Sequence, residues 1–441
     1  MVLVFCPKVT SRLKYTLNLI FDTLLGVEWD LTISPEVFSG FEGARVNYSK
    51  APLSGKEVLV IPSGFLEKRG VQPFEPGLLR KGELPCLFPS KGAADDFGFD
   101  LFAASFYLIS RYEEYLPHKK DRHGRFQAED SFAFKHGFLE VPVVNHYAIM
   151  LQKALLQKFP ELVFPVREYS FVPTYDIDIA YAYRGRGFFR GVGACLRSLF
   201  KLDFTALRER LQVLTQKAAD PFDTYDLQLS WHRKYGLRAF YFFLCAEYGP
   251  FDRNISVFST VFQNLVKKIS DYAFTGIHPS YASGEDPEKL STEVGRLSKI
   301  LNREIHFSRQ HYLRMQMPAT YRNLIRNNID HDFSMGYASQ PGFRASIVSP
   351  FFFYDLGREE ATSLKVFPFA VMDSTLKDYL GLEPEQVSER IAKLVEAVRA
   401  VDGTFMSLWH NEPLCECGKW KGWRDVYEQL LETAAKKTML P

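Results

Sequence analysis

Short apolar runs that end in polar residues recur from residue 171 onward, and this pattern constrains the fold most. Six of these runs are typical of strands, at residues 171–177, 238–245, 274–278, 304–307, 364–369 and 404–410. Segments with helical spacing of apolar residues lie between them, such as the one that follows Asp286, a residue type favoured as an N-cap. Repeated strand–helix units predict a parallel sheet, either open or closed as a barrel. Polar residues at the ends of the strands favour the barrel.

The first 160 residues also have an α/β pattern. Strands are predicted at residues 2–5 and 57–62, and helices at residues 13–24, 101–112 and 145–159. Pro160 and Pro165 then interrupt the pattern. We therefore predict a smaller α/β domain at 1–162 and a (β/α) domain at 163–441. The first domain contains neither GxGxxG nor a P-loop, so its sequence indicates no role.

The bulk composition narrows the classes of function. The chain has 441 residues, of which 46% are hydrophobic and 24% charged, as in ordinary soluble proteins. Its net charge of +2 argues against a nucleic-acid or membrane-surface partner. We find no run of about 18 apolar residues, so we predict no transmembrane segment. The apolar start of the chain is too short for a signal peptide, which favours a cytoplasmic location.

Six cysteines are scattered along the sequence and form neither a disulfide framework nor a CxxC pair. Cys415 and Cys417 follow His410 closely and would be close enough in sequence to bind a metal together. We interpret them instead as part of a reduced loop.

The segment 184–215 is basic and contains several glycines. It follows directly after two acidic residues, Asp176 and Asp178. We interpret it as an insertion with a solvated basic face that folds over the site or packs on the first domain. Phosphate binding is the alternative.

Asp176 and Asp178 lie at the end of the first of these strands. Because strand side chains alternate between faces, the two carboxylates point the same way. Two such charges repel each other unless a cation lies between them or one takes up a proton. The pair is therefore typical of a metal site with an adjacent general base, whereas the bland alternative is a solvated turn.

Four further polar motifs follow in order. They are GIHPSY with His278, SRQHY with Arg309 and His311, DHDFSMGY with Asp332, and SLWHNE with His410. This order resembles the polysaccharide deacetylase superfamily, which includes carbohydrate esterase family four, over about residues 165–430. The resemblance implies an irregular (β/α) barrel of roughly seven strands, preceded here by the smaller α/β domain.

The resemblance also implies catalytic roles. Asp176 matches the base that takes a proton from water, and Arg309 matches the arginine that orients this base. His410 matches the general acid that protonates the leaving amine. Asp332 matches the acid of the fourth motif, and the alternative for it is a loop acid.

Asp178 and His278 match two ligands of a divalent metal, for which zinc is expected. The second metal histidine of the family normally lies four residues after the first, where this chain has Ala282. Because two protein ligands make a weak site, we predict His311 as the third ligand. The alternatives are an oxygen ligand from Ser280 or Ser283, although neutral hydroxyls are poor zinc ligands, and loss of the metal.

Aromatic and cationic residues beside the motifs are candidates for substrate binding. They are Tyr281, Tyr337, Arg344 and Trp409. For Arg344 the alternative is a structural ion pair with Asp332.

The sequence thus favours a metal-dependent hydrolase that removes an N-acyl group from an amino sugar in surface-polysaccharide metabolism. A hydrolase of a small non-peptide amide is a second interpretation. A non-catalytic carbohydrate-binding or scaffold protein derived from a deacetylase is a third, which Ala282 favours. Retained buried charges speak against this third interpretation because they are costly to keep.

Overall fold

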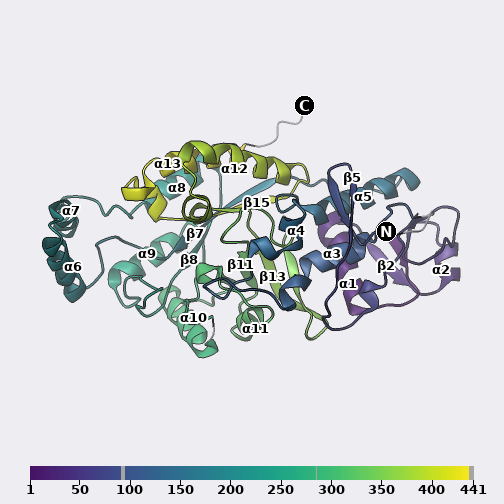
Figure 1. Cartoon of the computed structure of the whole chain (residues 1–441), viewed down its shortest axis with the longest axis horizontal. Helices are drawn as coiled ribbons and strands as arrows, with labels where there is room; N and C mark the ends of the chain where they lie inside the picture. Colours follow the sequence, from purple (N-terminus) through teal and green to yellow (C-terminus); the bar gives the residue numbers. More distant parts are fainter. Residues whose placement is uncertain (91–94, 285, 437–441) are drawn as a thin grey trace.

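The computed structural model describes residues 1–90, 95–284 and 286–436, and it is a mixed α/β protein with two sheets built from parallel strands (Figure 1). The smaller sheet and its helices occupy one end of an elongated molecule. The larger sheet forms the middle.

The smaller sheet has four parallel strands in the order β2-β1-β3-β4. Their bounds are Trp29–Thr32, Val2–Phe5, Ala44–Asn47 and Val58–Leu59. An antiparallel pair, β5 (Leu78–Lys81) and β6 (Leu84–Leu87), lies beside it. The helices of this region are α1 (Ser11–Leu17, continued by a π-helical segment Asn18–Leu25), α2 (Pro35–Gly40), α3 (Leu101–Ile109), α4 (Phe132–Lys135) and α5 (Val143–Lys158).

The larger sheet has nine strands in the order β12-β13-β11-β10-β9-β8-β7-β15-β14. Their bounds in chain order are β7 Ser170–Ile177, β8 Phe240–Phe243, β9 Phe274–Ile277, β10 Phe307–Ser308, β11 His331–Met335, β12 Phe351–Asp355, β13 Glu360–Pro368, β14 Val371–Met372 and β15 Thr404–His410. Only the edge pair β12–β13 is antiparallel.

The order of the strands shows that this sheet curls back on itself. β13 and β14 are separated by two residues in the chain, yet they lie near opposite ends of the strand order. Between them, Phe369 N–H donates to Met335 of β11 and Ala370 N–H donates to Met406 of β15. The two sides of the sheet therefore meet at this bend, which confirms the predicted parallel sheet and its barrel-like curvature.

An apolar cluster fills the inside of the curl. It consists of buried and partly buried side chains from most of the strands, and the buried ones include Phe242 of β8, Phe333 of β11 and Met406 of β15. The rings of Phe242 and Phe333 lie 5.1 Å apart although two strands separate β8 from β11 in the sheet. This contact across the curl supports the polar residues at the strand ends from below.

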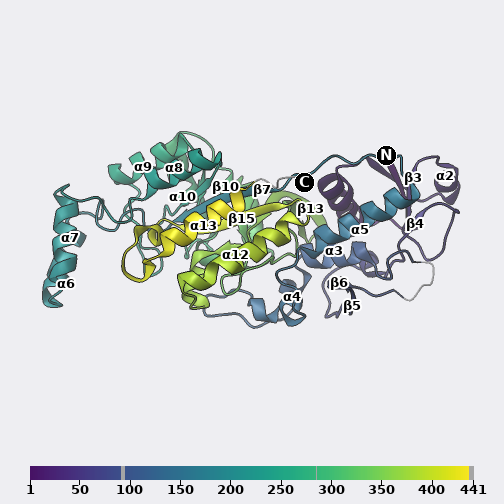
Figure 2. The same cartoon turned by 90° about the horizontal axis from the view of Figure 1, so that it is seen from above.

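Helices cover the outside of the curl (Figure 1, Figure 2). They are α8 (Tyr225–Tyr235), α9 (Thr260–Ser270), α10 (Pro287–Leu301), α11 (Ala319–Arg326), α12 (Pro384–Arg399) and α13 (Trp423–Ala435). Asp286 caps α10 as predicted, since its carboxylate accepts from the N–H groups of Glu288 and Lys289.

The two regions of the chain pack closely together. Residues 159–169, which connect them, form neither helix nor strand. Arg12 Nε donates to Glu359 at 2.9 Å, and Asn145 Nδ2 donates to Ser349 at 3.0 Å. One hydrophobic cluster contains buried residues of both regions.

The basic segment folds differently from the prediction. It forms α6 (Phe188–Phe200) and α7 (Phe204–Leu214), which stand away from the sheet at the end of the molecule opposite the N-terminal region (Figure 1, Figure 2). It therefore neither covers the strand ends nor packs on the first region.

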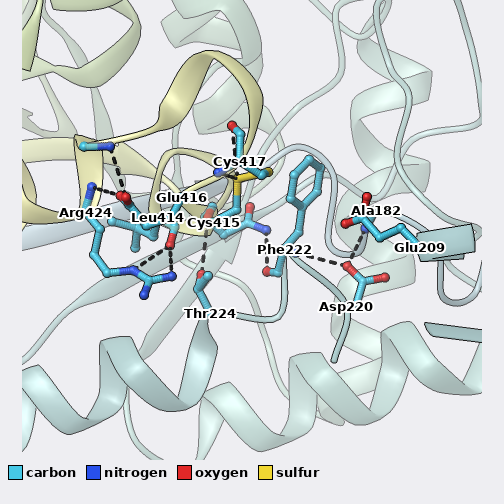
Figure 3. Close-up of a disulfide and its surroundings, with 12 residues drawn as sticks. Ala182, Glu209, Asp220, Phe222, Thr224, Leu414, Cys415, Glu416, Cys417 and Arg424 are labelled. Atoms are coloured by element: carbon cyan, nitrogen blue, oxygen red, sulfur yellow. Dashed lines mark hydrogen bonds between the residues drawn. A yellow bond between two sulfur atoms is a disulfide. The ribbon is translucent and has the colours of Figure 1, made fainter. Parts of the chain in front are cut away.

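The prediction of a reduced loop at Cys415 and Cys417 was also wrong. The two sulfur atoms form a disulfide in the turn after β15 (Figure 3). Bonded sulfurs are not thiolates, so this pair is not a metal site. No helix in the described part of the chain combines the length and the apolar character that crossing a membrane requires.

Candidate active site

Four strands deliver polar side chains to one edge of the curled sheet. Asp176 is the penultimate residue of β7, His278 follows β9, Arg309 follows β10 and His410 ends β15. β7 and β15 pair in parallel, with Asp176 opposite His410. Because the carboxyl ends of parallel strands meet at one edge, residues far apart in sequence converge there.

Asp178, His278 and His311 form a compact group of three potential metal ligands whose ligand atoms lie within 4.8 Å of one another. Asp178 Oδ1 lies 3.1 Å from His278 Nε2, and Asp178 Oδ2 lies 3.2 Å from His311 Nε2. The structure thus brings His311 to the place where a third ligand was predicted.

The hydrogen bonds of the two histidines fix which nitrogen atoms carry protons. His278 Nδ1 lies 2.6 Å from the carbonyl oxygen of Arg309, and His311 Nδ1 lies 2.8 Å from Asp252 Oδ1. Both oxygens only accept, so each Nδ1 must donate. In the neutral histidines each Nε2 then presents a lone pair to the carboxylate of Asp178.

Facing lone pairs require a positive charge between them. Burial alone would raise the pKa of Asp178, but His311 and His278 hold it well below its usual range. Burial lowers the pKa of His311, and Asp178 together with Asp252 more than offsets this, raising it to about 9. A proton supplies the charge when no cation is bound. One carboxylate and two imidazoles held by outer partners also fit Zn²⁺ as protein ligands.

Asp176 lies beside this group and is held from behind by Arg309. Arg309 NH1 donates to Asp176 Oδ1 at 3.0 Å, and its Nε donates to the carbonyl of Phe333 at 2.9 Å. The guanidinium lies 4.6 Å from the ring centre of Phe242 and is fully buried. Arg309 therefore separates the apolar inside of the curl from the polar edge and orients Asp176.

His410 faces the same group from β15. Its Nδ1 lies 2.8 Å from Asp373 Oδ1, and its Nε2 lies 3.7 Å from Asp178 Oδ2. Burial lowers the pKa of His410, but Asp373 and then Asp178 raise it well above the usual value. The charged imidazolium is thus favoured at neutral pH, as a proton donor requires.

Asp373 was not predicted from the sequence. It follows the two-residue strand β14 and occupies the role expected of an acid partner to His410. The sequence feature that could have identified Asp373 is the short apolar run 369–372, which this acid follows directly.

Asp332 lies behind the site rather than in it. Its carboxylate is fully buried and accepts from the N–H and hydroxyl of Ser334 at 2.9 and 2.8 Å. Burial raises the pKa of Asp332 to about 6. The structure does not place Asp332 where it would contact a substrate.

A cavity of about 410 Å³ opens over these residues. Its walls include Asp176, Asp178, His278, His311, His410, Gln310, Tyr312, Met372 and Tyr379. Arg122 and Arg125 also line it, although they belong to the N-terminal region. Arg125 donates to the carbonyl of Tyr312 at 2.6 Å and to the hydroxyl of Tyr379 at 2.9 Å. The segment 117–127 thereby forms one wall of the cavity.

Three of the predicted substrate-binding residues lie elsewhere. Arg344 is buried and binds Glu114 with two hydrogen bonds of 2.9 and 2.6 Å, so its ion-pair partner is not Asp332. The hydroxyl of Tyr337 is bound by Arg111 at 2.8 Å. Trp409 is fully buried and packs against Tyr427 at 4.9 Å between ring centres.

Tyr281 lies beside the main cavity rather than on its wall. Its ring stacks on Phe251 with the ring centres 4.2 Å apart. Tyr281 and Ala282 both line a neighbouring cavity of about 350 Å³. The position four residues after His278, Ala282, therefore faces away from Asp178, His278 and His311.

Known proteins resemble this chain only weakly or over part of its length. A family of unknown function (DUF7033) matches residues 2–160. No curated protein matches the chain.

Among solved structures, a putative polysaccharide deacetylase from Mycobacterium smegmatis is similar with 11% identity and a TM-score of 0.40, over 61% of this chain and 86% of that chain. Puue allantoinase is similar with 8% identity and a TM-score of 0.36, over 59% and 84%. A CE4 family pseudoenzyme from Bacillus anthracis has 9% identity and a TM-score of 0.29, over 60% and 61%. Likenesses this weak carry no information about the chemistry of this chain.

Proposed function

We propose that the protein is a metal-dependent hydrolase that removes an N-acyl group from an amino sugar. The observation that carries this proposal is the arrangement of Asp178, His278 and His311. Their ligand atoms lie within 4.8 Å of one another, while the outer nitrogen atoms of both histidines are held by acceptors. Such outer partners are typical of metal-binding histidines.

A divalent ion in this triad, with zinc as the expected one, would supply Lewis acidity to a water molecule and to an acyl oxygen. Asp176 accepts the proton of the attacking water, and Arg309 keeps the carboxylate in position for this step. His410 donates a proton to the leaving nitrogen, and Asp373 holds its ring and favours its charged form. Base and acid thus stand on two adjacent strands, β7 and β15.

The choice of an amino sugar rests on the sequence resemblance and on the chemistry of the cavity. Its walls combine carboxylates, imidazoles and an amide with the aromatic rings of Tyr312 and Tyr379. Polar groups that fix hydroxyls and rings that cover a sugar face are the contacts a carbohydrate needs. We further propose that residues 1–162 and 163–441 are two domains, with the first supplying the wall formed by residues 117–127.

The test is a screen of zinc-loaded protein against N-acetylated amino sugars, their oligomers and small non-peptide amides, with release of acid and of free amine as the readouts. We expect release from an acetamido sugar, and a loss of about 10²–10⁴-fold in kcat for Asp176→Asn and for His410→Gln. Metal content should be retained in both variants. Asp226→Asn, at an exposed site on α8, is the control.

Two results would change the proposal. Cleavage of small amides alone would assign the site to that second class of hydrolase. Full metal occupancy with sugar binding and no turnover would favour a non-catalytic carbohydrate-binding protein.

A further inference from the structure

The two helices α6 and α7 form a hairpin that stands clear of the rest of the molecule (Figure 1, Figure 2). We call residues 188–217 the projecting hairpin. Helix packing normally buries an apolar stripe against a core. The projecting hairpin stands away from the core. Its two helices contact each other, and Glu209 and Arg210 of α7 contact Tyr183 at its base.

Large apolar side chains gather on the projecting hairpin. Of the twenty-two large apolar side chains that are exposed in the described part of the chain, eight lie within it. They are Val192, Leu196, Leu199, Phe200, Leu202, Phe204, Leu211 and Leu214. The three most exposed are Phe200 at 87%, Leu202 at 73% and Phe204 at 62%, at the tip between the helices. A contiguous apolar patch of this kind marks an interaction surface.

The spacing of these residues places them on one side of each helix. In α6, Val192, Leu196, Leu199 and Phe200 follow the positions i, i+4, i+7 and i+8. Such positions lie on one helical face. Each helix is therefore amphipathic, and the tip joins the two apolar faces.

Charge distinguishes the projecting hairpin from the rest of the chain. It contains six basic and two acidic residues, a net charge of +4. Because the whole chain carries +2, the remaining residues sum to −2. The overall charge of +2 argued against a membrane-surface partner. It is the sum of a basic hairpin and an otherwise slightly acidic protein, so it does not exclude such a partner for the hairpin.

We propose that the projecting hairpin docks on the surface of an anionic lipid bilayer. The apolar tip enters the boundary between headgroups and acyl chains, and residues such as Arg197 and Lys201 bind headgroup phosphates. Short helices that combine an apolar face with basic residues lie in the plane of this boundary. Each helix is too short to span the bilayer.

Charge also argues against a second copy as the occupant. A symmetric contact between two projecting hairpins would place one net charge of +4 against another, which is repulsive. An anionic surface provides charges of the opposite sign over its whole area.

The base of the projecting hairpin is fixed to the rim of the candidate active site. Asp220 accepts from the N–H group of Ala182 at 2.8 Å (Figure 3) and from that of Tyr183 at 2.8 Å. Asn411, next to His410, donates to the carbonyls of Ile179 and Phe222 at 3.1 Å each. A docked hairpin would therefore hold the site at a fixed position relative to the bilayer. The docking proposal does not depend on the hydrolytic function.

The test is flotation of the full chain with vesicles of phosphatidylcholine alone and with vesicles of equal parts phosphatidylcholine and phosphatidylglycerol. We expect binding only to the anionic vesicles, weakened by salt. The triple variant Phe200→Ser, Leu202→Ser, Phe204→Ser should bind at least tenfold more weakly, and Arg197→Glu with Lys201→Glu should also lose binding.

The matched control is Val163→Ser with Val166→Ser, which removes two equally exposed apolar side chains outside the hairpin. Sedimentation of the same proteins gives the oligomeric state, and thermal unfolding checks the fold. Equal vesicle binding by wild type and triple variant, or no binding to anionic vesicles at low salt, overturns the proposal. Self-association of wild type that the triple variant loses would assign the surface to a second copy instead.

Discussion

Two clusters of charge differ in how their hydrogen bonds are satisfied. The upper cluster, in the candidate active site, consists of Asp178, His278 and His311, and the lower cluster consists of Arg111, Glu114 and Arg344. In the lower cluster, Glu114 accepts from Arg111 at 2.7 Å and from Arg344 at 2.9 and 2.6 Å. Every carboxylate oxygen there has a donor. In the upper cluster, Asp178 faces the Nε2 atoms of His278 and His311, which carry no proton in the neutral rings.

The difference separates a structural cluster from a binding cluster. Paired charges stabilise the fold as long as both partners are present. Facing acceptors gain stability only when a cation or a proton arrives. Each cluster places one carboxylate between two nitrogen-bearing side chains, so the direction of each hydrogen bond is the property that distinguishes them.

The largest expected effect concerns the lower cluster. Glu114→Gln leaves two buried guanidinium groups without their shared carboxylate, so the free energy of unfolding should fall by about 3–5 kcal/mol. Urea denaturation measures this loss, and Glu129→Gln at an exposed position is the control. The folded variant should still bind one metal ion. Loss of metal together with stability would show that the two clusters are not independent.

His311→Ala tests the upper cluster, where we expect a large loss of metal affinity and only a small loss of stability. Removal of one of three ligands should weaken zinc binding at least hundredfold, about 2.7 kcal/mol. The unfolding free energy of the metal-free protein should fall by less than in Glu114→Gln. Competition with a chromophoric chelator gives the affinity, and His306→Ala, a half-exposed histidine, is the control. Unchanged affinity would remove His311 from the ligand set.

Asp252→Asn should have a smaller effect because Asp252 acts through His311. The variant keeps the shape of the side chain but weakens the acceptor that holds His311 Nδ1. We expect zinc affinity to fall about 10–100-fold. The same competition assay measures it, and an affinity equal to that of the wild type would show that the Nδ1 contact does not orient the ring.

Lowering the pH should release the metal from the upper cluster before it affects the lower cluster, and the change per pH unit is the smallest of the expected effects. The pKa of His311 is raised to about 9, so below this value a proton competes with metal and affinity should fall about tenfold per unit. The pKa of Glu114 is lowered from 4.5 to about 2, against the effect of burial, mainly by Arg344 and Arg111. Its stabilising contribution is present above about pH 4.5 and is lost as pH falls toward 2. Metal titrations and circular dichroism from pH 8.5 to 5 should show metal loss with the fold retained.

Sequence patterns predicted the strands that have a local signature. β1 and β15 have the predicted bounds, and Gly26 ends the first helical segment in the left-handed conformation expected of a C-cap. β2 was missed because Trp29–Thr32 is half exposed and lacks an apolar run. β14 was missed because it has only two residues, so the apolar run 369–372 is too short to predict a strand by itself, and the strand forms by pairing with β15.

The dependence on local patterns also explains which site residues could be predicted. Asp176, Asp178 and His278 follow apolar runs and could be placed from the sequence alone. Asp252 and Asp373 were missed because they act through histidines 59 and 37 residues away in the chain. Arg344 was misplaced because its partner, Glu114, lies 230 residues before it.

Residues 117–127 add a wall to the cavity, and this wall makes the choice of substrate partly independent of the reaction. The groups proposed to carry out the reaction stand on the curled sheet, whereas Arg122 and Arg125 come from the N-terminal region. Mutations of the exposed Arg122 can change the charge and width of the entrance while the groups on the strand ends keep their partners. The range of acceptable substrates can therefore change, in evolution or by engineering, while the reaction itself stays the same.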